Sequence, residues 1–421
     1  MGHVGFGSYR VSIKSEMHKS ALIKALKAGC SLIDTSSNYT DGDSEELIGS
    51  VLSEHPEFKP LLVTKAGYIQ GKNLKILEDL NKKGLAVEDI IDLSETLKHS
   101  IHPEFLKNQL NQSLQRLKCS YVDYFLLHNP EYYFQVEGAS KDEYYARLKK
   151  AFIYCEEEVA SGRIKAYGVS SNNFVLPIDD PHVTDLSKII KILSDINAKN
   201  FKMVQFPFNL IEIGALEKLG EYGDESLLDI CMRNNFLSVI NRPLNAFTQN
   251  KLVRFATYKE LYKNLDEIKS IEKYSECMGL LRTKWNESSD EITTDDDFDR
   301  IEIISQFKNV WNTLPTPDAV EQVYFGHIFP FIARIWGGSL TALESRPFYE
   351  LMEYSEIYSR RILSTKALEF KNQAMQVGLL PNEEDRLFSV MAVETYLDYG
   401  FDYVLVGMRK PEYVDQMKHL F

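Results

Sequence analysis

The chain has 421 residues, of which 44% are hydrophobic and 26% are charged, so it has ample material for a folded core and does not resemble a disordered protein. Its 48 basic and 61 acidic residues give a net charge of −13, which argues against a protein whose main task is to bind nucleic acid or an anionic membrane surface. A barrel-sized domain of about 250 residues plus roughly 150 others would account for the length.

No segment reaches the length of uninterrupted apolar sequence that a membrane-spanning helix needs, and the first residues do not form a secretory signal. The five cysteines are scattered singly without a CxxC pair, which is typical of reduced thiols. The histidines show no metal-binding spacing such as HExxH. We therefore expect a cytoplasmic protein with no membrane partner, no nucleic-acid partner and no metal.

Eight short apolar segments predict strands, because longer segments with helical spacing lie between them, as His18 to Ala28 and Pro103 to Leu117 do. The strands are expected at residues 4–8, 31–36, 61–66, 122–128, 164–170, 203–206, 237–242 and 403–407. Such alternation is typical of an α/β protein with a parallel sheet. It favours a closed (β/α)8 TIM barrel, and an open doubly wound sheet is the alternative.

Two connections are much longer than βα units require. About 55 residues separate the third and fourth strands, and about 160 separate the seventh and eighth, where roughly 30 would suffice. The helical spacing of residues 251–284 and 346–376 predicts a mostly helical insertion. We expect a discontinuous barrel of residues 1–246 and 385–421, with an insertion of residues 247–384 that could serve as a lid, a pocket wall or an oligomer contact. The oligomeric state stays open.

Ionisable side chains stand at the ends of three successive predicted strands. Asp34, Lys65 and His128 end strands two, three and four, and Tyr39 follows Asp34 by five residues. The strands of a parallel barrel all end at one mouth, so these four side chains should converge there. A nearby cation would lower the pKa of the Tyr39 hydroxyl from its usual value of about 10. Lys65 can supply that charge, Asp34 can hold Lys65, and His128 can hydrogen-bond a carbonyl oxygen, which predicts a proton donor beside a carbonyl substrate.

The barrel portion, about residues 1–245 and 385–421, resembles the aldo-keto reductases. The segments whose order and spacing are similar to that family's signatures are LIDTSSNYTDGDSEELIG, LLVTKAG, SLQRLKCSYVDYFLLHNP, GRIKAYGVSSNNF and LVGMRKPEYV. The resemblance implies a barrel that transfers hydride between NADPH, or NADH as a second possibility, and a small-molecule aldehyde, ketone or alcohol. It implies that Tyr39 is the general acid or base, tuned by Lys65 and Asp34, and that His128 orients the carbonyl.

The resemblance also implies cofactor-binding positions. Ser170 and Gln205 match residues that bind the nicotinamide carboxamide, and Asn172 is a candidate for a further contact. Arg409 and Lys410 stand where the family holds the adenosine 2′-phosphate. Two cations at the start of a helix suit such an anion.

Several positions depart from the family pattern. Asn241 and Arg242 stand at the end of strand seven, where many relatives have a Tyr that stacks on the nicotinamide; Asn241 cannot stack, and Arg242 could contact the pyrophosphate. Gln416 and Met417 replace a Glu-Asn pair that binds the adenine in many relatives. These departures keep an alternative open, a nicotinamide-nucleotide-binding regulatory protein with little or no turnover.

A third possibility is a lyase or isomerase that forms a Schiff base on Lys65. It is disfavoured, because an adjacent Asp34 would keep the amine protonated.

Overall fold

The computed structural model describes residues 2–82, 88–218, 225–248, 251–258, 266–288, 298–338 and 340–421. The chain divides into two compact units. The first comprises Met1–Ala246 and Val390–Phe421, and the second comprises Phe247–Ser389.

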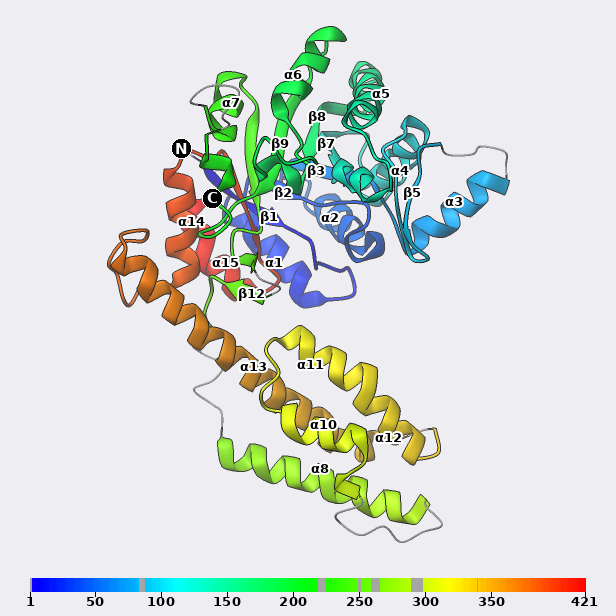
Figure 1. The fold of residues 1–421 in the computed structure, drawn as a ribbon, viewed down its shortest axis with the longest axis vertical. Helices are drawn as coiled ribbons and strands as arrows, with labels where there is room; N and C mark the ends of the chain where they lie inside the picture. The colour runs from blue at the N-terminus through cyan, green and yellow to red at the C-terminus, as the bar shows by residue number, and fades with distance from the viewer. Residues whose placement is uncertain are drawn as a thin grey trace. The chain divides into compact units, whose positions relative to one another are not determined.

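The first unit is a closed barrel of parallel strands (Figure 1). Around the barrel the order is β1, β13, β10, β9, β8, β7, β3 and β2. The strands are β1 (His3–Gly7), β2 (Leu32–Asp34), β3 (Leu61–Ala66), β7 (Val122–His128), β8 (Ile164–Ser170), β9 (Phe201–Pro207), β10 (Leu237–Asn241) and β13 (Tyr403–Gly407). These are the eight predicted strands, so the (β/α)8 barrel is confirmed and the open sheet is excluded.

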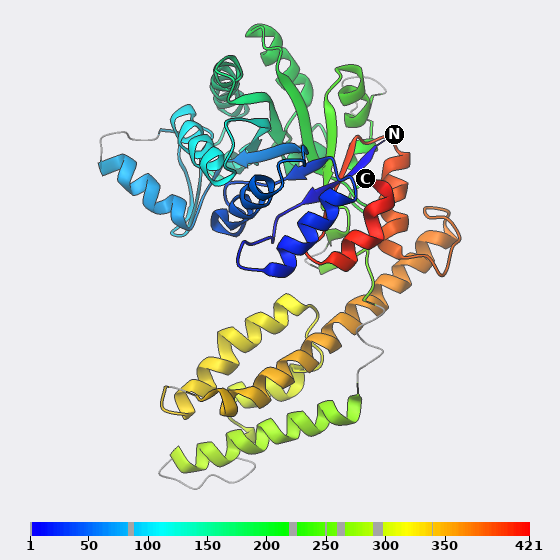
Figure 2. The same cartoon turned by 180° about the vertical axis from the view of Figure 1, so that it is seen from behind.

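Helices alternate with the strands and cover the outside of the barrel. They are α1 (Glu16–Lys27), α2 (Asp43–Glu54), α4 (Pro103–Arg116), α5 (Lys141–Ala160), α6 (Leu186–Asp195), α7 (Leu227–Arg233), α14 (Phe388–Asp398) and α15 (Pro411–Met417). Helix α1 illustrates how the sequence produces these helices. Ser15 caps its first turn, and the helix buries the residues whose spacing predicted it, which are Ala21, Leu22, Ala25 and Leu26. The first and last helices lie side by side, as Figure 2 shows, and an ion pair between Lys24 and Asp415 joins them.

The barrel interior is filled by side chains from six of its strands. They are Leu32, Val63, Leu126, Met203, Val239 and Leu405. Close packing requires a glycine at residue 168, because a Cβ there would lie 1.9 Å from the Met203 carbonyl oxygen. The interior is therefore a packed core, and functional side chains must lie above it, toward the strand ends.

The long connection between β3 and α4 contains structure that the sequence did not predict. It holds helix α3 (Lys72–Lys82) and a three-stranded sheet of β4 (Tyr68–Ile69), β6 (Leu97–His99) and β5 (Ile91–Ser94), in that order. These strands are two to four residues long, too short for an alternating pattern to stand out.

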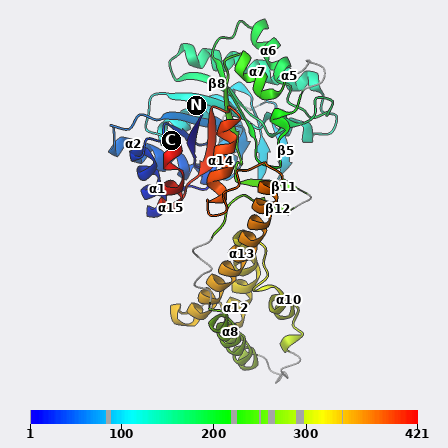
Figure 3. The same ribbon diagram turned by 90° about the vertical axis from the view of Figure 1, so that its left-hand side faces the viewer.

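The second unit is mostly helical. It contains α8 (Glu267–Ser288), α10 (Glu302–Val310), α11 (Pro317–Val323), a π-helical turn (Tyr324–Ile328), α12 (Phe329–Ile335) and α13 (Ala342–Gln376). Helix α13, which Figure 3 labels, contacts α8 and begins with a capping box between Thr341 and Glu344. Strands β11 (Asn245–Thr248) and β12 (Lys251–Arg254) form a hairpin. The helical prediction for residues 251–284 was therefore wrong at its start, where pairing with β11 decides the structure.

This unit has a hydrophobic core of its own. Buried residues of α8, α10, α11, α12 and α13 form one cluster, in which Tyr324 and Leu351 are fully buried. In the described part of the chain, no helix combines the length and the apolar character needed to cross a membrane.

Candidate active site

The four predicted catalytic side chains meet at the carboxyl ends of the barrel strands. Asp34 is the last residue of β2, Lys65 the next-to-last of β3, and His128 the last of β7. All three are buried, Lys65 completely. Tyr39 is half-buried and begins a short 3-10 helix after β2, Tyr39–Gly42. Parallel pairing of β2 with β3 and of β3 with β7 aligns these strand ends and brings the side chains together.

Lys65 lies at the centre of the site. Its Nζ donates to Asp34 Oδ1 at 2.6 Å, to the Thr35 carbonyl oxygen at 2.8 Å and to the Tyr39 hydroxyl at 3.2 Å. These contacts satisfy all three of its N–H groups. Burial lowers the pKa of Lys65, but the charge of Asp34 and the hydrogen bonds to Asp34 and Tyr39 outweigh burial and leave that pKa raised. Lys65 is therefore an ammonium at neutral pH.

Tyr39 keeps its proton. Burial raises the pKa of its hydroxyl, and the Lys65 charge only partly opposes this. The prediction that Lys65 would bring this pKa below its usual value is thus not met, because desolvation of the phenolate outweighs the cation. The hydroxyl accepts from Lys65, and its own O–H has no acceptor among the described residues.

His128 presents a neutral imidazole to the same space. Burial, Lys65 and His99 lower the pKa of His128 well below its usual value. Its Nδ1 lies 3.0 Å from Ser36 Oγ, and its ring stands edge-on to Tyr68 and Tyr39, with centroids 4.8 and 5.9 Å away. Its Nε2 has no hydrogen-bond partner within the described ranges. Within the described structure, the Tyr39 O–H without an acceptor and His128 Nε2 without a partner therefore share one site.

The small inserted sheet packs against His128. His99 of β6 donates from Nε2 to the His128 carbonyl oxygen at 2.7 Å. Tyr68 of β4 packs on both histidine rings. Gly67 precedes β4, and a Cβ at this residue would lie 2.3 Å from the His128 oxygen. Sequence reasoning missed these three residues, since the only signal for their strands was a connection of unusual length.

The residues predicted to bind the nicotinamide carboxamide lie next to the Asp34–Lys65 pair. Ser170 ends β8, Gln205 lies in β9, and both are buried. The Ser170 hydroxyl donates to Gln205 Oε1 at 2.8 Å, and Gln205 Nε2 donates to Asp34 Oδ2 at 2.8 Å. Asn172 is less buried than Ser170 and Gln205. Its side chain is half-buried, and its backbone N–H donates to Glu131 Oε1.

The remaining predicted cofactor residues lie at the ends of β10 and β13. The Oδ1 atom of Asn241 is buried and has no hydrogen-bond partner within the described structure. Arg242 forms an ion pair with Glu212 at 3.1 Å, so its charge is already partly neutralised. Arg409 is exposed and Lys410 half-buried at the start of α15, and in the described part of the chain neither side chain has an ion pair.

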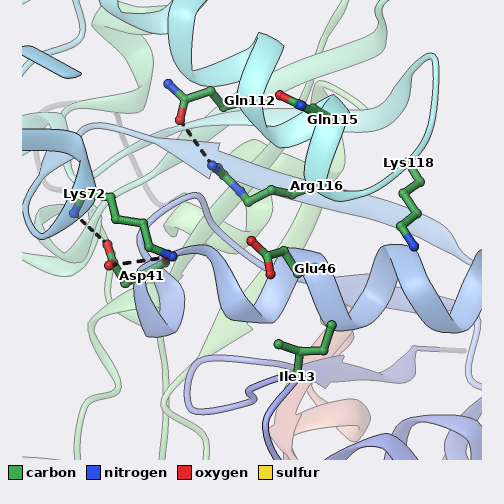
Figure 4. A pocket seen from close by; sticks show the side chains of 8 residues that line it. All are labelled: Ile13, Asp41, Glu46, Lys72, Gln112, Gln115, Arg116 and Lys118. Carbon is green, nitrogen blue, oxygen red and sulfur yellow. Dashed lines mark hydrogen bonds and ion pairs between the residues drawn. The ribbon is translucent and has the colours of Figure 1, made fainter. Parts of the chain in front are cut away.

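A separate hollow of about 500 Å3 lies on the outside of the barrel and is lined partly by α2 and α4 (Figure 4). Two of its charged lining residues, Lys72 and Asp41, contact each other, and Arg116 donates to the neutral Gln112. None of the four candidate catalytic residues lines this hollow. It is therefore distinct from the candidate site.

A closed (β/α)8 barrel that carries a buried Lys-Asp pair and a His at its strand ends, with a Tyr shortly after β2, is the arrangement expected of an aldo-keto reductase. The sequence profile described as "Aldo/keto reductase family" matches residues 1–244, and the chain belongs to that family.

Individual relatives are distant. The NADH-specific methylglyoxal reductase of Escherichia coli is 23% identical over 164 residues, which are 39% of this chain and 42% of that protein. The chain thus matches less than half the length of that relative. Among solved structures, a glycerol dehydrogenase from Gluconobacter oxydans is 17% identical with a TM-score of 0.48, covering 99% of this chain and 86% of that one. An aldo-keto reductase from Klebsiella pneumoniae in complex with NADPH is 19% identical with a TM-score of 0.36, covering 57% and 64% of the two chains.

Proposed function

We propose that this protein is an oxidoreductase that transfers hydride between NADP(H), or NAD(H), and a small aldehyde or ketone and its alcohol. The observation that carries the proposal is the pairing of a Tyr39 hydroxyl whose proton has no acceptor in the described structure with a neutral His128 beside it. These two groups can hold one carbonyl oxygen between them. Family membership supports the same reaction class.

The chain's own residues supply the proton and the orientation. His128 donates from Nε2 to the carbonyl oxygen in the tautomer whose Nδ1 accepts from the Ser36 hydroxyl, which then turns from Asn38 Oδ1 and the Lys65 carbonyl oxygen toward the imidazole. Tyr39 then gives its proton to that oxygen, and the Lys65 ammonium, 3.2 Å away, stabilises the phenolate that remains. Asp34 keeps Lys65 charged and in place. In the reverse direction Tyr39 accepts the proton of the alcohol.

A nicotinamide nucleotide fits the residues around this site. Gln205 has one N–H and one oxygen lone pair left for a carboxamide, and the buried Asn241 Oδ1 has no partner within the described residues. Arg409 and Lys410 would hold a phosphate. The bound nucleotide would supply or accept the hydride. Two relatives differ in cofactor, since one is named NADH-specific and another is solved with NADPH, so the preference for NADPH rests on Arg409 and Lys410.

The decisive test removes the Tyr39 hydroxyl and leaves its ring. Tyr39→Phe should lower kcat on the best substrate of an aldehyde and ketone panel by about 10²- to 10⁴-fold while NADPH still binds. Tyr167→Phe is the matched control, because Tyr167 is a buried barrel tyrosine whose hydroxyl contacts Glu156. Full turnover by Tyr39→Phe would refute the assignment.

The alternative is a regulatory protein that binds the nucleotide with little turnover. Two features favour this alternative. The ion pair with Glu212 already engages the charge with which Arg242 would bind a pyrophosphate. Asn241 also provides no aromatic ring to stack on the nicotinamide. Tight NADPH binding without turnover of any substrate in the panel would decide for this alternative.

A further inference from the structure

Gln205 and Asp34 lie on β9 and β2, which are not neighbours in the barrel, yet their side chains bond across it. A carboxylate can only accept, so the amide nitrogen of Gln205 must face Asp34. We infer that Gln205 is a positioning residue for the Asp34–Lys65–Tyr39 group, beyond the carboxamide contact proposed for it. The inference rests on the proposed function only for its kinetic consequences.

The hydrogen bonds around Asp34 leave its carboxylate little freedom. Oδ1 accepts from Lys65 at 2.6 Å, and Oδ2 accepts from Gln205 at 2.8 Å. Its backbone oxygen accepts from the Ser8 hydroxyl at 2.7 Å. With both carboxylate oxygens held, rotation of the carboxylate is blocked, and the Lys65 ammonium is fixed at its distance from the Tyr39 hydroxyl.

The same amide connects this group to the cofactor side of the site. Ser170 donates to Gln205 Oε1, which fixes the amide from its other end. An amide has two N–H donors and two oxygen lone pairs, so Gln205 retains one of each. A nicotinamide carboxamide can take these without displacing Asp34. Gln205 thus links occupancy of the cofactor site to the carboxylate that holds Lys65.

The charge balance at Asp34 gives the direction of the expected effect. The groups that face it are the Lys65 ammonium from β3, Tyr39 after β2, and the amide of Gln205 from β9; the neutral His128 of β7 lies against Tyr39. Burial raises the pKa of Asp34, while Lys65 and the Gln205 N–H act against it. Removing that N–H therefore raises the pKa of Asp34 further, so that, as pH falls, Asp34 becomes protonated at a higher pH than in the wild type.

Two variants separate the link to Asp34 from simple cofactor binding. Gln205→Met keeps the length of the side chain but has no N–H, whereas Ser170→Ala removes the partner at the other end of the amide and leaves the bond to Asp34. NADPH affinity is measured by fluorescence titration and kcat/KM by its pH profile. We expect both variants to weaken NADPH binding about three- to tenfold. Only Gln205→Met should move the acidic limb of the profile to higher pH, by about one unit.

The inference is overturned if the acidic limb of Gln205→Met coincides with that of the wild type, or if Ser170→Ala moves it equally. Gln205→Leu is the second variant should Gln205→Met not fold. It also lacks the N–H that donates to Asp34, so it should move the acidic limb in the same direction.

A measurement without turnover separates this inference from the proposed function. A wild type that reduces no carbonyl refutes the function. The link to Asp34 is then tested by thermal unfolding of the wild type and Gln205→Met across acidic and neutral pH. The difference in Tm between the wild type and Gln205→Met should shrink as pH falls, because the lost hydrogen bond stabilises the ionised form of Asp34. A difference that is constant with pH would overturn the inference.

Discussion

Replacing Lys65 by Met should destabilise the barrel strongly, because it leaves Asp34 buried without its cation. Both side chains are almost completely excluded from solvent, and their ion pair is 2.6 Å long. Removing one partner of a buried pair costs about 3–5 kcal/mol of unfolding free energy. Gln205 still donates to Asp34 in this variant, which favours the lower end of that range. The activity proposed for Tyr39 should also be lost.

The stability lost in Lys65→Met should depend on pH. The pKa of Lys65 is raised in the folded state, so the stabilisation it provides is complete below its usual value of about 10.5 and disappears only as pH rises through the folded value. An assay at pH 7.5 therefore lies within the full effect. At low pH the loss should be smaller, because Asp34 can then take up a proton and no longer needs a cation.

The unfolding measurement must distinguish unfolding of the barrel from unfolding of the second unit. All three tryptophans, Trp285, Trp311 and Trp336, lie in the second unit, so their fluorescence follows that unit. Circular dichroism follows the whole chain, and a denaturant transition that changes by circular dichroism but not by fluorescence belongs to the barrel. Tryptophan fluorescence is thus a control within the same sample.

Two further variants separate stability from chemistry. Asp34→Asn combined with Lys65→Met removes both charges and should recover part of the stability without recovering turnover. Arg116→Met breaks a different pair, between the half-buried Arg116 and the buried Glu45 at 2.6 Å, and should lower stability while kcat is retained. A loss below about 1 kcal/mol for Lys65→Met at pH 7.5 would refute the reasoning, since that is the range of an exposed ion pair.

Other outcomes follow from the support of His128 and from the basic residues after β13. Gly67→Ala should cost about 1–3 kcal/mol and lower kcat, because its Cβ would lie 2.6 Å from His99 Nε2 and 2.3 Å from the His128 oxygen; unchanged denaturation and kinetics would contradict this packing. Arg409→Ala with Lys410→Ala should weaken NADPH about tenfold or more and leave NADH binding unchanged, as paired titrations would show, and equal losses for both would exclude a 2′-phosphate site. The pH profile of carbonyl reduction should lack a transition near pH 6.5, because the pKa of His128 lies well below that value; a step there that His128→Gln abolishes would show otherwise.

The barrel and the meeting of Asp34, Lys65 and His128 could be predicted from sequence because both follow from strand periodicity. Each of these residues ends a strand or lies next to its end, and parallel pairing brings neighbouring strand ends together. Tyr39 follows from its fixed distance along the chain from Asp34. No contact with a distant segment was needed for any of these inferences.

What could not be predicted depends on contacts between distant segments. His99 reaches His128 through strands too short to have a recognisable period. The bond from Gln205 to Asp34 crosses the barrel, so it depends on how closely the far walls approach. The protonated state of Tyr39 depends on the balance of burial against the Lys65 charge, which only a three-dimensional arrangement defines.

The place of β13 in the chain has a consequence for folding. This strand pairs with both β10 and β1, and residues 403–407 are synthesised after the other seven barrel strands and after the second unit. Until then a sheet of the other seven strands would be open, and its two exposed edges, β1 and β10, could pair with other chains. The second unit has its own core and can fold during this interval. Truncation just before β13 should therefore leave a soluble second unit attached to an aggregation-prone sheet.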